Sequence, residues 1–409
     1  MIIFTTFCVR IISRQNPGFC RQVSDKEVNV MYKIGTFNKI SPVGMGKLTD
    51  DYVVVENPDE ANGIILRSYD MHDMEFSDEL LAIGRAGAGT NNVPVDRCSE
   101  LGIVVFNAPG ANANAVKELC ICGMIMAARN VPDGLAWAKT LKGSEGVGKQ
   151  IEKGKGQFAG TEIMGKTLGI IGLGAIGRLV AESAVMLGMN VIGYDAFMTD
   201  AVREMLPPPV QVVDDLSELY PQCDYISIHV PANDATKGMM NAAAFAQMKD
   251  GVIFLNFARD KLMNDDDLLA ALASGKVAKY VTDFADDAVL NSDEPGIIVL
   301  PHLGASSAEA EDNCATMAVT QVMDYIENGN ILNSVNMPTV ILGPKKDCPR
   351  LSVICKASAE SDVMFKLNQL ELSDVVSGKR GEYAYILADL EDKKVDLEVA
   401  GIIRQRVIE

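Results

Sequence analysis

The feature that most constrains the fold of this sequence is a glycine-rich turn, Gly172-Leu-Gly174-Ala-Ile-Gly177. It follows an apolar run, Leu168–Ile171, that is typical of a buried strand, and it opens a helical pattern that ends at Gly188. Between a strand and a helix, the first glycine allows a tight turn, the second lets backbone amides approach a pyrophosphate, and the third lets the helix pack closely on the strand. The motif therefore predicts a dinucleotide-binding domain built on a parallel sheet.

A carboxylate follows the next predicted strand. Asp195 comes directly after the apolar run Asn190–Tyr194 and well beyond Gly177. At this place a carboxylate can accept hydrogen bonds from the adenosine ribose hydroxyls, and it repels a 2′-phosphate. NAD is therefore expected as the cofactor in preference to NADP. The alternative, that the three glycines merely form a turn, does not account for a strand, a helix and an acid in register.

Short apolar runs alternate with helical patterns in two parts of the chain, which predicts two α/β units with parallel sheets. The first part contains strand-like runs at Tyr52–Glu56, Gly63–Leu66 and Ile103–Asn107 and a helix at Pro94–Leu101. The second contains strands at Thr167–Gly172, Asn190–Tyr194, Asp224–Val230, Val252–Asn256 and Val299 onward, with helices at Ala175–Gly188 and Asp265–Ser274. The fold class expected is therefore α/β, with two Rossmann-like doubly wound domains.

Three further segments complete the expected organisation. Long helices are predicted at Ala115–Arg129 and Glu309–Asn328, and the Lys/Gly-rich stretch Lys139–Gly160 is expected to be a surface connection because its periodicity is weak. The tail, residues 350–409, predicts a small α+β domain. Its elements are expected as a strand at Leu351–Lys356, a helix at Ser361–Leu372, a turn at Ser377–Gly381, a strand at Tyr383–Asp389 and a second helix near Val395–Gly401.

Charge and cysteine usage exclude several classes of protein. The 37 Lys and Arg residues against 55 Asp and Glu residues give 37 − 55 = −18, a net charge that disfavours nucleic-acid and anionic-membrane partners. The apolar stretch Leu119–Ala128 is about half of the roughly 20 residues that a membrane-spanning helix needs. Nine scattered cysteines without a C-x-x-C pair predict free thiols, no metal site and a cytoplasmic location.

The first thirty residues differ from the rest of the chain. No acidic residue precedes Asp25, whereas Arg10, Arg14 and Arg21 are basic. Three interpretations stay open: a tail that is disordered or precedes a true start at Met31, an organelle-targeting peptide, or a structured arm.

The residues expected to carry chemistry also follow predicted strands. Arg259 comes shortly after Val252–Leu255 and can hold a carboxylate with two hydrogen bonds, while His302 follows Ile297–Leu300 and can exchange protons near neutral pH. Oxidation of an alcohol by NAD needs both a cation for the substrate and a base for the hydroxyl proton. The alternatives are a solvated ion-pair partner for Arg259 and a surface-loop residue for His302.

Two further residues end strands in this part of the chain. Asp283 follows the apolar run Tyr280–Thr282 and could accept a hydrogen bond from the nicotinamide carboxamide, or could simply cap the strand. His229 is expected to be a packed strand-end residue near the cofactor.

Taken together, Gly172–Gly177, Asn256–Asp260 and Pro301–Ala305 resemble the D-isomer-specific 2-hydroxyacid dehydrogenases. Within that family, longer stretches resemble the members that oxidise 3-phosphoglycerate to 3-phosphohydroxypyruvate with NAD, the first step of serine biosynthesis. These stretches are Met31–Gly44, Gly84–Val93, Asn107–Asn114 and Pro301–Ser306, and the similarity extends from Met31 to about Pro338.

The resemblance implies roles for individual residues. Arg259 would orient the substrate and His302 would accept the hydroxyl proton, while Arg67 and Arg85 would hold the substrate phosphate and carboxylate. The residues implied to contact NAD are Gly172, Gly174, Ala175, Ile176, Gly177, Asp195, His229, Phe257, Ala258, Arg259, Asp283 and His302. Another 2-oxo acid such as 2-oxoglutarate, or a weakly active NAD-sensing protein, are the alternatives for function.

The resemblance also implies a division into domains. The substrate-binding domain would comprise residues 31–120 and 303–338, the NAD-binding domain residues 121–302, and the linker residues 339–349. The tail, 350–409, resembles a shortened ACT regulatory domain, a βαββαβ module. Assembly as a homodimer or homotetramer is expected, and an amino-acid effector such as serine stays an open question.

One residue departs from the family pattern. The glutamate that holds the catalytic histidine is expected five positions after Asp283, where this chain has Ala288. Asp286 and Asp287 are close to that position, and whether either replaces the glutamate cannot be predicted from the sequence. A missing carboxylate would weaken the base without abolishing cofactor binding.

Overall fold

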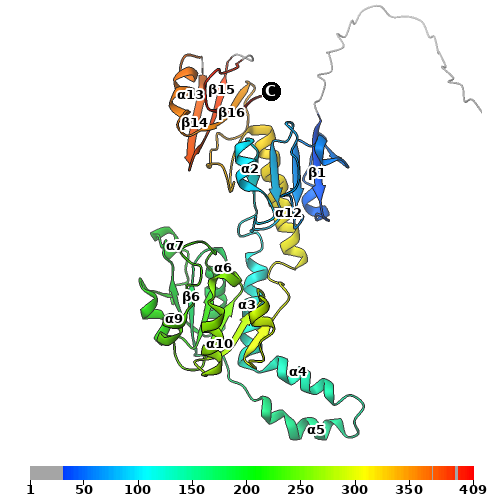
Figure 1. Ribbon diagram of the computed structural model, residues 1–409, viewed down its shortest axis with the longest axis vertical. Coiled ribbons are helices and arrows are strands. Elements are labelled where there is room, and N and C mark those ends of the chain that lie inside the picture. The colour runs from blue at the N-terminus through cyan, green and yellow to red at the C-terminus, as the bar shows by residue number, and fades with distance from the viewer. Residues whose placement is uncertain (1–30, 371, 392–394) are drawn as a thin grey trace, which may run out of the picture.

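The computed structural model describes residues 31–370, 372–391 and 395–409 (Figure 1). The predicted N-terminal extension, residues 1–30, lies outside the described residues. The described chain forms a five-stranded sheet, a seven-stranded sheet and a four-stranded sheet. Two parallel-sheet α/β units followed by a small antiparallel sheet confirm the expected fold class.

The first sheet is entirely parallel and has the strand order β2-β1-β3-β4-β5. This order reverses between β1 and β3, as in other doubly wound folds. Helix α12 packs against β3, β4 and β5 although it comes from far along the chain. The strands are β1 (Tyr32–Phe37), β2 (Tyr52–Val55), β3 (Gly63–Leu66), β4 (Ala82–Arg85) and β5 (Val104–Phe106), and the helices are α1 (Pro42–Met45), α2 (Val95–Glu100) and α12 (Ala308–Asn328).

The second sheet has the order β12-β11-β10-β9-β6-β7-β8, again with parallel neighbours. The strand order reverses at β6, so the chain leaves β6 at the point where doubly wound sheets bind ligands. The strands are β6 (Thr167–Ile171), β7 (Asn190–Tyr194), β8 (Gln211–Val212), β9 (Tyr225–Ile228), β10 (Val252–Asn256), β11 (Val277–Thr282) and β12 (Ile297–Val299). The helices are α6 (Ala175–Met186), α7 (Asp200–Glu204), α8 (Leu216–Leu219), α9 (Ala242–Gln247), α10 (Asp265–Ala273) and α11 (Asp287–Leu290).

Helix α3 (Ala113–Ala128) contains the most apolar stretch discussed above and packs against α6, β10 and β11. Its buried side chains include Val116, Cys120 and Met124, which belong to the core of the second unit. The apolar stretch is therefore a buried helix face, as predicted. In the described part of the chain, no helix is long and apolar enough to cross a membrane.

The stretch Lys139–Gly160 lies at the surface, as predicted, but it is largely helical. Helices α4 (Val131–Thr140) and α5 (Val147–Gly154) form a hairpin that projects from the second unit, followed by a short 3-10 turn at Lys155–Phe158 (Figure 1). The rings of Trp137 and Phe158 pack with centroids 5.3 Å apart. This contact between distant residues stabilises the hairpin, and a short-range hydrophobic period does not report it.

The tail forms an antiparallel sheet with the order β14-β15-β13-β16 and one helix. Its elements are β13 (Arg350–Lys356), α13 (Glu360–Leu367), β14 (Leu372–Arg380), β15 (Tyr383–Leu390) and β16 (Ile402–Ile408).

Three predicted details of the tail are wrong. The helix ends at Leu367, residues 395–401 are not helical, and the hairpin turn lies at Gly381–Glu382 because Arg380 pairs with Tyr383. The backbone of Gly381 has φ +56°, the left-handed conformation that a tight turn requires, so the strands extend further than the glycine and serine content of Ser377–Gly381 suggested.

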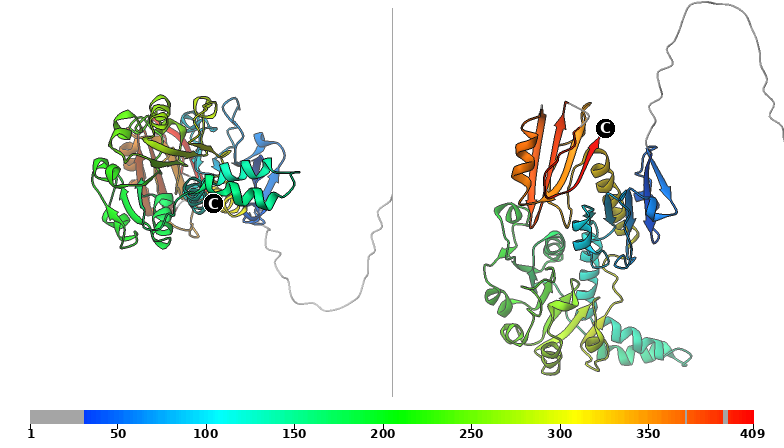
Figure 2. Two further views of the ribbon diagram at one scale, coloured as in Figure 1. Left: turned by 90° about the horizontal axis from the view of Figure 1, so that it is seen from below. Right: turned by 45° about the horizontal axis from the view of Figure 1, so that its top comes forward.

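The tail shares a hydrophobic core with the first unit. Tyr385 and Leu387 pack in one cluster with Phe106 and Tyr325, and the Tyr385 hydroxyl donates to the carbonyl of Gly329 at 2.6 Å. The right-hand view of Figure 2 shows the tail sheet beside the end of α12 and the first sheet. The tail is therefore fixed to the first unit by a continuous apolar interface.

We expect Asp389→Asn to destabilise the protein by about 3–5 kcal/mol, because it leaves a buried guanidinium without its counter-charge. Arg350 and Asp389 are both 0% exposed, and the Arg350 Nε donates to Asp389 Oδ1 at 2.6 Å. Urea unfolding of the whole chain measures the change. The matched control is Asp374→Asn, which removes a half-exposed partner of Lys346 in the same sheet and should cost under about 1 kcal/mol. Equal effects of the two substitutions on the free energy of unfolding would show that the buried Arg350–Asp389 ion pair contributes no more than the exposed one.

Candidate active site

The glycine turn lies between β6 and α6, as the motif predicted. Gly172 has φ +95°, and a Cβ at Gly177 would lie 1.9 Å from the Gly172 carbonyl oxygen, so this position requires a glycine. A Cβ at Gly174 would meet no atom within 4 Å. The space over Gly174 and the free amides of the first turn of α6, at Ala175 and Ile176, fit a pyrophosphate.

Asp195 connects the end of β7 to this turn. Its Oδ2 accepts from the backbone N–H of Leu173 at 2.8 Å, and its Oδ1 accepts from Phe197 at 2.8 Å. A carboxylate has about four acceptor positions, so each oxygen retains one for a ribose hydroxyl. The carboxylate is therefore held in place beside the turn, where the sequence placed the ribose of NAD.

His229 ends β9 next to the same turn. Its Nε2 lies 2.9 Å from the Ser227 hydroxyl, whereas its buried Nδ1 has no partner among the described residues. Burial lowers the pKa of His229 to about 4, so the ring is neutral at physiological pH. A neutral, packed strand-end histidine agrees with the expectation, and the unpartnered nitrogen is a place where a ligand could bind.

We expect Gly174→Ala to leave folding unchanged and to weaken NAD binding by roughly tenfold or more, because the added methyl fills the space that a pyrophosphate would use. Calorimetric titration with NAD measures the affinity, and thermal unfolding tests the fold. Gly148→Ala is the control, since a Cβ there also meets no atom within 4 Å, its backbone is not left-handed, and it lies in α5 outside the turn. Unchanged NAD affinity in Gly174→Ala would contradict this placement of the cofactor.

Arg259 is presented by a turn that Asn256 closes. The Asn256 Oδ1 accepts from the N–H groups of Ala258 and Arg259 at 3.1 and 3.2 Å, and its Nδ2 donates to the Arg259 carbonyl at 2.8 Å. Asn256 is fully buried at the end of β10. The side chain of Phe257 points into the core against Gly123, so a contact with a cofactor could come only from its backbone.

His302 lies on the loop after β12, with φ +49° and its N–H donating to the Leu300 carbonyl at 2.9 Å. A non-glycine residue in the left-handed region costs energy, and such residues gather at functional sites. The imidazole packs on Phe284 with ring centroids 4.3 Å apart, and the guanidinium of Arg259 lies over the same ring at 5.2 Å. Phe284 thus brings the predicted base and the predicted cation together.

Asp283 lies beneath this cluster. Its Oδ2 accepts from the Gly304 N–H at 2.8 Å and would lie 3.0 Å from a Cβ at Gly304, which is a tight contact. Its buried Oδ1 has no partner among the described residues. Burial raises the pKa of Asp283, while the Gly304 N–H, His302 and Arg259 oppose the shift. An unpaired buried acceptor fits the predicted carboxamide of nicotinamide.

The position of the missing glutamate, Ala288, is exposed on α11. Asp286 caps that helix by accepting from the Val289 N–H at 3.0 Å, and it also interacts with Asp265. Burial and the Asp286 carboxylate raise the pKa of Asp265. Asp286 caps α11 and interacts with Asp265, and Asp287 is exposed. Neither aspartate makes a described contact with His302.

Arg67 and Arg85 meet at the carboxyl edge of the first sheet. Arg85 ends β4 and Arg67 follows β3, and the paired strands align Leu66 with Arg85. Burial is the main cause that lowers the pKa of Arg85, and the neighbouring guanidiniums of Arg259 and Arg67 lower it further. Among the described residues Arg85 has no ion-pair partner, and its buried Nε is unpaired. Three guanidiniums from two domains therefore gather at one place.

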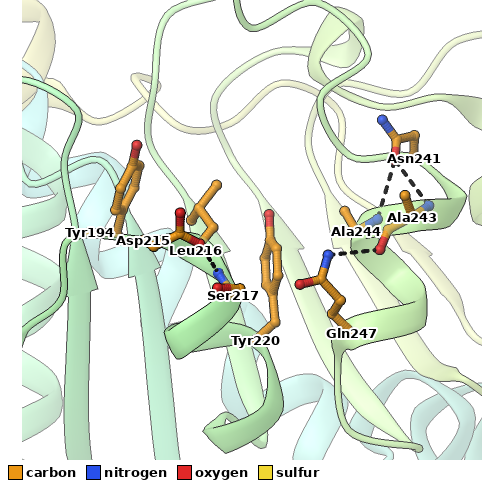
Figure 3. Close-up of a pocket in the computed structure, with 9 residues that line it drawn as sticks. All are labelled: Tyr194, Asp215, Leu216, Ser217, Tyr220, Asn241, Ala243, Ala244 and Gln247. Carbon is orange, nitrogen blue, oxygen red and sulfur yellow. Dashed lines mark hydrogen bonds between the residues drawn. The ribbon is translucent and has the colours of Figure 1, made fainter.

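A pocket of about 350 Å³ lies beside the end of β7 (Figure 3). It adjoins the glycine turn, because its lining residue Tyr194 precedes Asp195 and the Tyr194 carbonyl accepts from the Gly172 N–H at 2.8 Å. The hydroxyls of Tyr194 and Tyr220 point the same way along it, and Asn241 caps α9 at its far side. None of the predicted site residues lines this pocket. The arginine cluster and the glycine turn contain the predicted site residues, and this pocket borders the glycine turn.

Some residues of the site were not predicted from the sequence. Phe284 supports His302 and Arg259, and Glu311 of α12 forms an ion pair with Arg67 in which Nη1 and Oε1 are 2.6 Å apart. Asn256 belongs to the stretch Asn256–Asp260 that resembles the family, but the sequence predicted no role for it. The position of Phe284 directly after Asp283 was the one signal available, because residues that follow parallel strands meet at one edge.

Comparisons with known proteins agree with this geometry. Residues 121–304 match the family model described as D-isomer-specific 2-hydroxyacid dehydrogenase, NAD-binding domain. D-3-phosphoglycerate dehydrogenase of Haemophilus influenzae is 32% identical over 363 residues, which cover 82% of this chain and 83% of that protein. The enzyme of the same name from Methanocaldococcus jannaschii is 37% identical over 273 residues, 65% of this chain. The chain spans about half the length of that archaeal relative.

Solved structures lead to the same family. NAD⁺-bound 3-phosphoglycerate dehydrogenase of Entamoeba histolytica aligns with a TM-score of 0.59 and 26% identity, covering 75% of this chain and 99% of that structure. A glyoxylate reductase, described as from Paecilomyes thermophila, aligns with a TM-score of 0.62 at 26% identity, over 75% of this chain and 98% of that chain. The matched NAD-binding domain contains the glycine turn, Asp195, Arg259 and His302. The cofactor is NAD, and the chain belongs to the D-isomer-specific 2-hydroxyacid dehydrogenase family.

Proposed function

We propose that this chain oxidises 3-phospho-D-glycerate to 3-phosphohydroxypyruvate with NAD, the first step of L-serine biosynthesis. The observation that carries the proposal is the cluster of Arg67, Arg85 and Arg259 beside His302. A substrate with a carboxylate and a phosphate brings about three negative charges, which a protein of net charge −18 can hold only in a local cationic site. Relatives from Haemophilus influenzae and Methanocaldococcus jannaschii that carry the name D-3-phosphoglycerate dehydrogenase support the same substrate.

Each cation has a separate task in this proposal. Arg259, held by Asn256, orients the substrate carboxylate through two parallel hydrogen bonds. Arg85 and Arg67 bind the phosphate from the facing domain, and the lack of a described ion-pair partner leaves Arg85 free to do so. Two anchors at opposite ends fix the substrate hydroxyl between them, next to His302.

His302 accepts the hydroxyl proton as the alcohol carbon loses a hydride. When NAD is bound, it supplies the hydride acceptor. Asp195 would hold the ribose and Asp283 the carboxamide, each through a carboxylate that the backbone already fixes. Because Ala288 provides no carboxylate, Phe284 and the turn at Leu300 would have to orient the imidazole.

The choice of substrate is tested by comparing 3-phosphoglycerate with D-2-hydroxyglutarate in wild-type protein and in Arg85→Ala. Preference for 3-phosphoglycerate in the wild type, and a loss of kcat/KM of about tenfold or more in Arg85→Ala, is the expected result. A wild type that prefers D-2-hydroxyglutarate would replace this proposal with the alternative, reduction of 2-oxoglutarate.

We also propose that the tail is a shortened ACT-like regulatory domain and that the protein is a cytoplasmic homodimer or homotetramer. The tail's order of one helix and four antiparallel strands matches a βαββαβ module without its second helix. Leu135 of α4 and Ile151 of α5 are exposed apolar side chains on the projecting hairpin, which supports self-association there. Light scattering that gives a monomer would refute the proposed oligomer. Calorimetry that detects no binding of serine would refute the regulatory role of the tail.

A further inference from the structure

A single amide group determines where the side chain of Arg259 begins. Both backbone polar groups of Arg259 bond to the side chain of Asn256. The Arg259 N–H donates to Asn256 Oδ1 at 3.2 Å, and the Arg259 carbonyl accepts from Asn256 Nδ2 at 2.8 Å. The guanidinium lies over the ring of Phe284 at 5.2 Å. A rotation of the Asn256 amide therefore moves the backbone that carries the proposed carboxylate-binding group.

Among the described residues, the Asn256 amide has one hydrogen-bond partner outside its own turn. Its other bonds go to the N–H of Ala258 and to the N–H and carbonyl of Arg259. The remaining bond is donated by Asn256 Nδ2 to the hydroxyl of Tyr280 at 3.2 Å, and Tyr280 lies on the neighbouring strand β11. The bonds within the turn define its shape, and the bond to Tyr280 fixes the amide relative to the sheet.

Solvent does not reach this contact. Asn256 and Tyr280 are 0% and 1% exposed, so removal of the hydroxyl leaves a buried N–H without an acceptor. The Tyr280 ring packs against Phe254 with ring centroids 6.4 Å apart, and a phenyl ring would preserve this packing. Burial raises the pKa of Tyr280 to about 12, so the hydroxyl stays protonated at moderately alkaline pH.

We propose that Tyr280 is a positioning residue of the active site, whose hydroxyl holds the Asn256 amide in the orientation that presents Arg259 to the substrate carboxylate. This inference rests on the proposed function, in which Arg259 binds that carboxylate. Filling the core requires the ring of Tyr280 and not its hydroxyl. Without the hydroxyl, the unpaired N–H favours other orientations of the amide, and the fraction of molecules with Arg259 in its binding position falls. The apparent affinity for a carboxylate falls by the same factor.

The test is Tyr280→Phe, with the binding of oxamate to the NADH-loaded protein measured by calorimetry. Oxamate carries a carboxylate and no phosphate, so it reports on Arg259 alone among the proposed anchors. We expect its affinity to fall about fivefold, the equivalent of one neutral hydrogen bond of about 1 kcal/mol, and the affinity for NADH to stay unchanged. Tyr385→Phe is the matched control, because it removes a buried hydroxyl that donates to the Gly329 carbonyl, away from the site. It should leave oxamate binding unchanged.

A double-mutant cycle separates positioning from a general loosening of the fold. The value of kcat/KM is measured for whichever acid the wild type oxidises better, 3-phosphoglycerate or D-2-hydroxyglutarate. Tyr280→Phe should lower it about fivefold in the wild-type background and by less than about twofold in Arg259→Ala, because the group that Tyr280 positions is then absent. An equal loss in both backgrounds would show that Tyr280 supports only the fold, and the inference would be overturned.

Oxamate binding also distinguishes a failure of this inference from a failure of the proposed function. If the wild type does not oxidise 3-phosphoglycerate, but oxamate binding falls in Tyr280→Phe and not in Tyr385→Phe, the proposed substrate is wrong and the role of Tyr280 stands. If 3-phosphoglycerate is oxidised and Tyr280→Phe binds oxamate as the wild type does, the reaction stands and the role of Tyr280 is overturned. A wild type that binds no oxamate would show that Arg259 does not hold a carboxylate, which also overturns the inference.

Discussion

Replacing His302 with alanine is expected to lower kcat for oxidation of 3-phosphoglycerate by about 10²–10⁴-fold, the usual contribution of a positioned general base. In this chain His302 is the histidine on the loop after β12, packed on Phe284 next to Arg259. The residual rate should rise with pH, because hydroxide can then remove the proton. Since His302 lies on an exposed loop, the fold and the unfolding temperature should change little.

The matched control is His72→Ala. His72 is half exposed, contacts Asp70 in the first unit and has no described contact with the glycine turn or the arginine cluster. Its activity should equal that of the wild type. Full activity in His302→Ala would show that another group accepts the proton, and Asp283 would then be the residue to test.

Arg259→Ala is expected to lower kcat/KM for 3-phosphoglycerate by roughly 10²–10⁴-fold. Two hydrogen bonds to a charged carboxylate contribute about 1.5–3 kcal/mol each, and both are lost. Arg259→Lys should recover only part of the activity, because an ammonium cannot form the two parallel bonds of a guanidinium. Steady-state kinetics over a range of substrate concentrations measure both variants.

Arg203→Ala is the control for the loss of one positive charge, since Arg203 is an exposed residue of α7. NAD binding through the glycine turn should persist in Arg259→Ala. If Lys and Ala variants at this position are equally active, the two-bond contact with the carboxylate is wrong.

Much of the fold could be predicted because its strands are short apolar runs between turn residues. Gly63–Leu66 and Val252–Asn256 are strands with the expected bounds, and α12 differs from its expected start by one residue. The hairpin of α4 and α5 could not be predicted, because Trp137 and Phe158 stabilise it across 21 residues of sequence. The prediction placed a turn at Ser377–Gly381, where the strand β14 in fact continues, because glycine and serine are common in turns. Pairing with β15 decides the length of β14.

In the site, too, local patterns could be predicted, whereas contacts between distant residues could not. The glycine turn, Asp195, Arg259 and His302 follow strands, so their common edge follows from the parallel topology. The contact of Arg67 with Glu311 joins residues 244 positions apart, and no local pattern contains it. The sequence could report that a glutamate was missing at Ala288, but only the structure shows that Asp286 caps α11 and is not a substitute for it.

The central claim, that this chain is an NAD-dependent dehydrogenase of 3-phosphoglycerate, is tested most directly by the formation of NADH from the wild-type protein, NAD and 3-phosphoglycerate at alkaline pH. We predict NADH formation with 3-phosphoglycerate, and its consumption in the reverse direction with 3-phosphohydroxypyruvate. If NAD binds but neither direction turns over, the claim is wrong, and the chain is a cofactor-sensing member of the family that has lost catalysis along with the glutamate at Ala288.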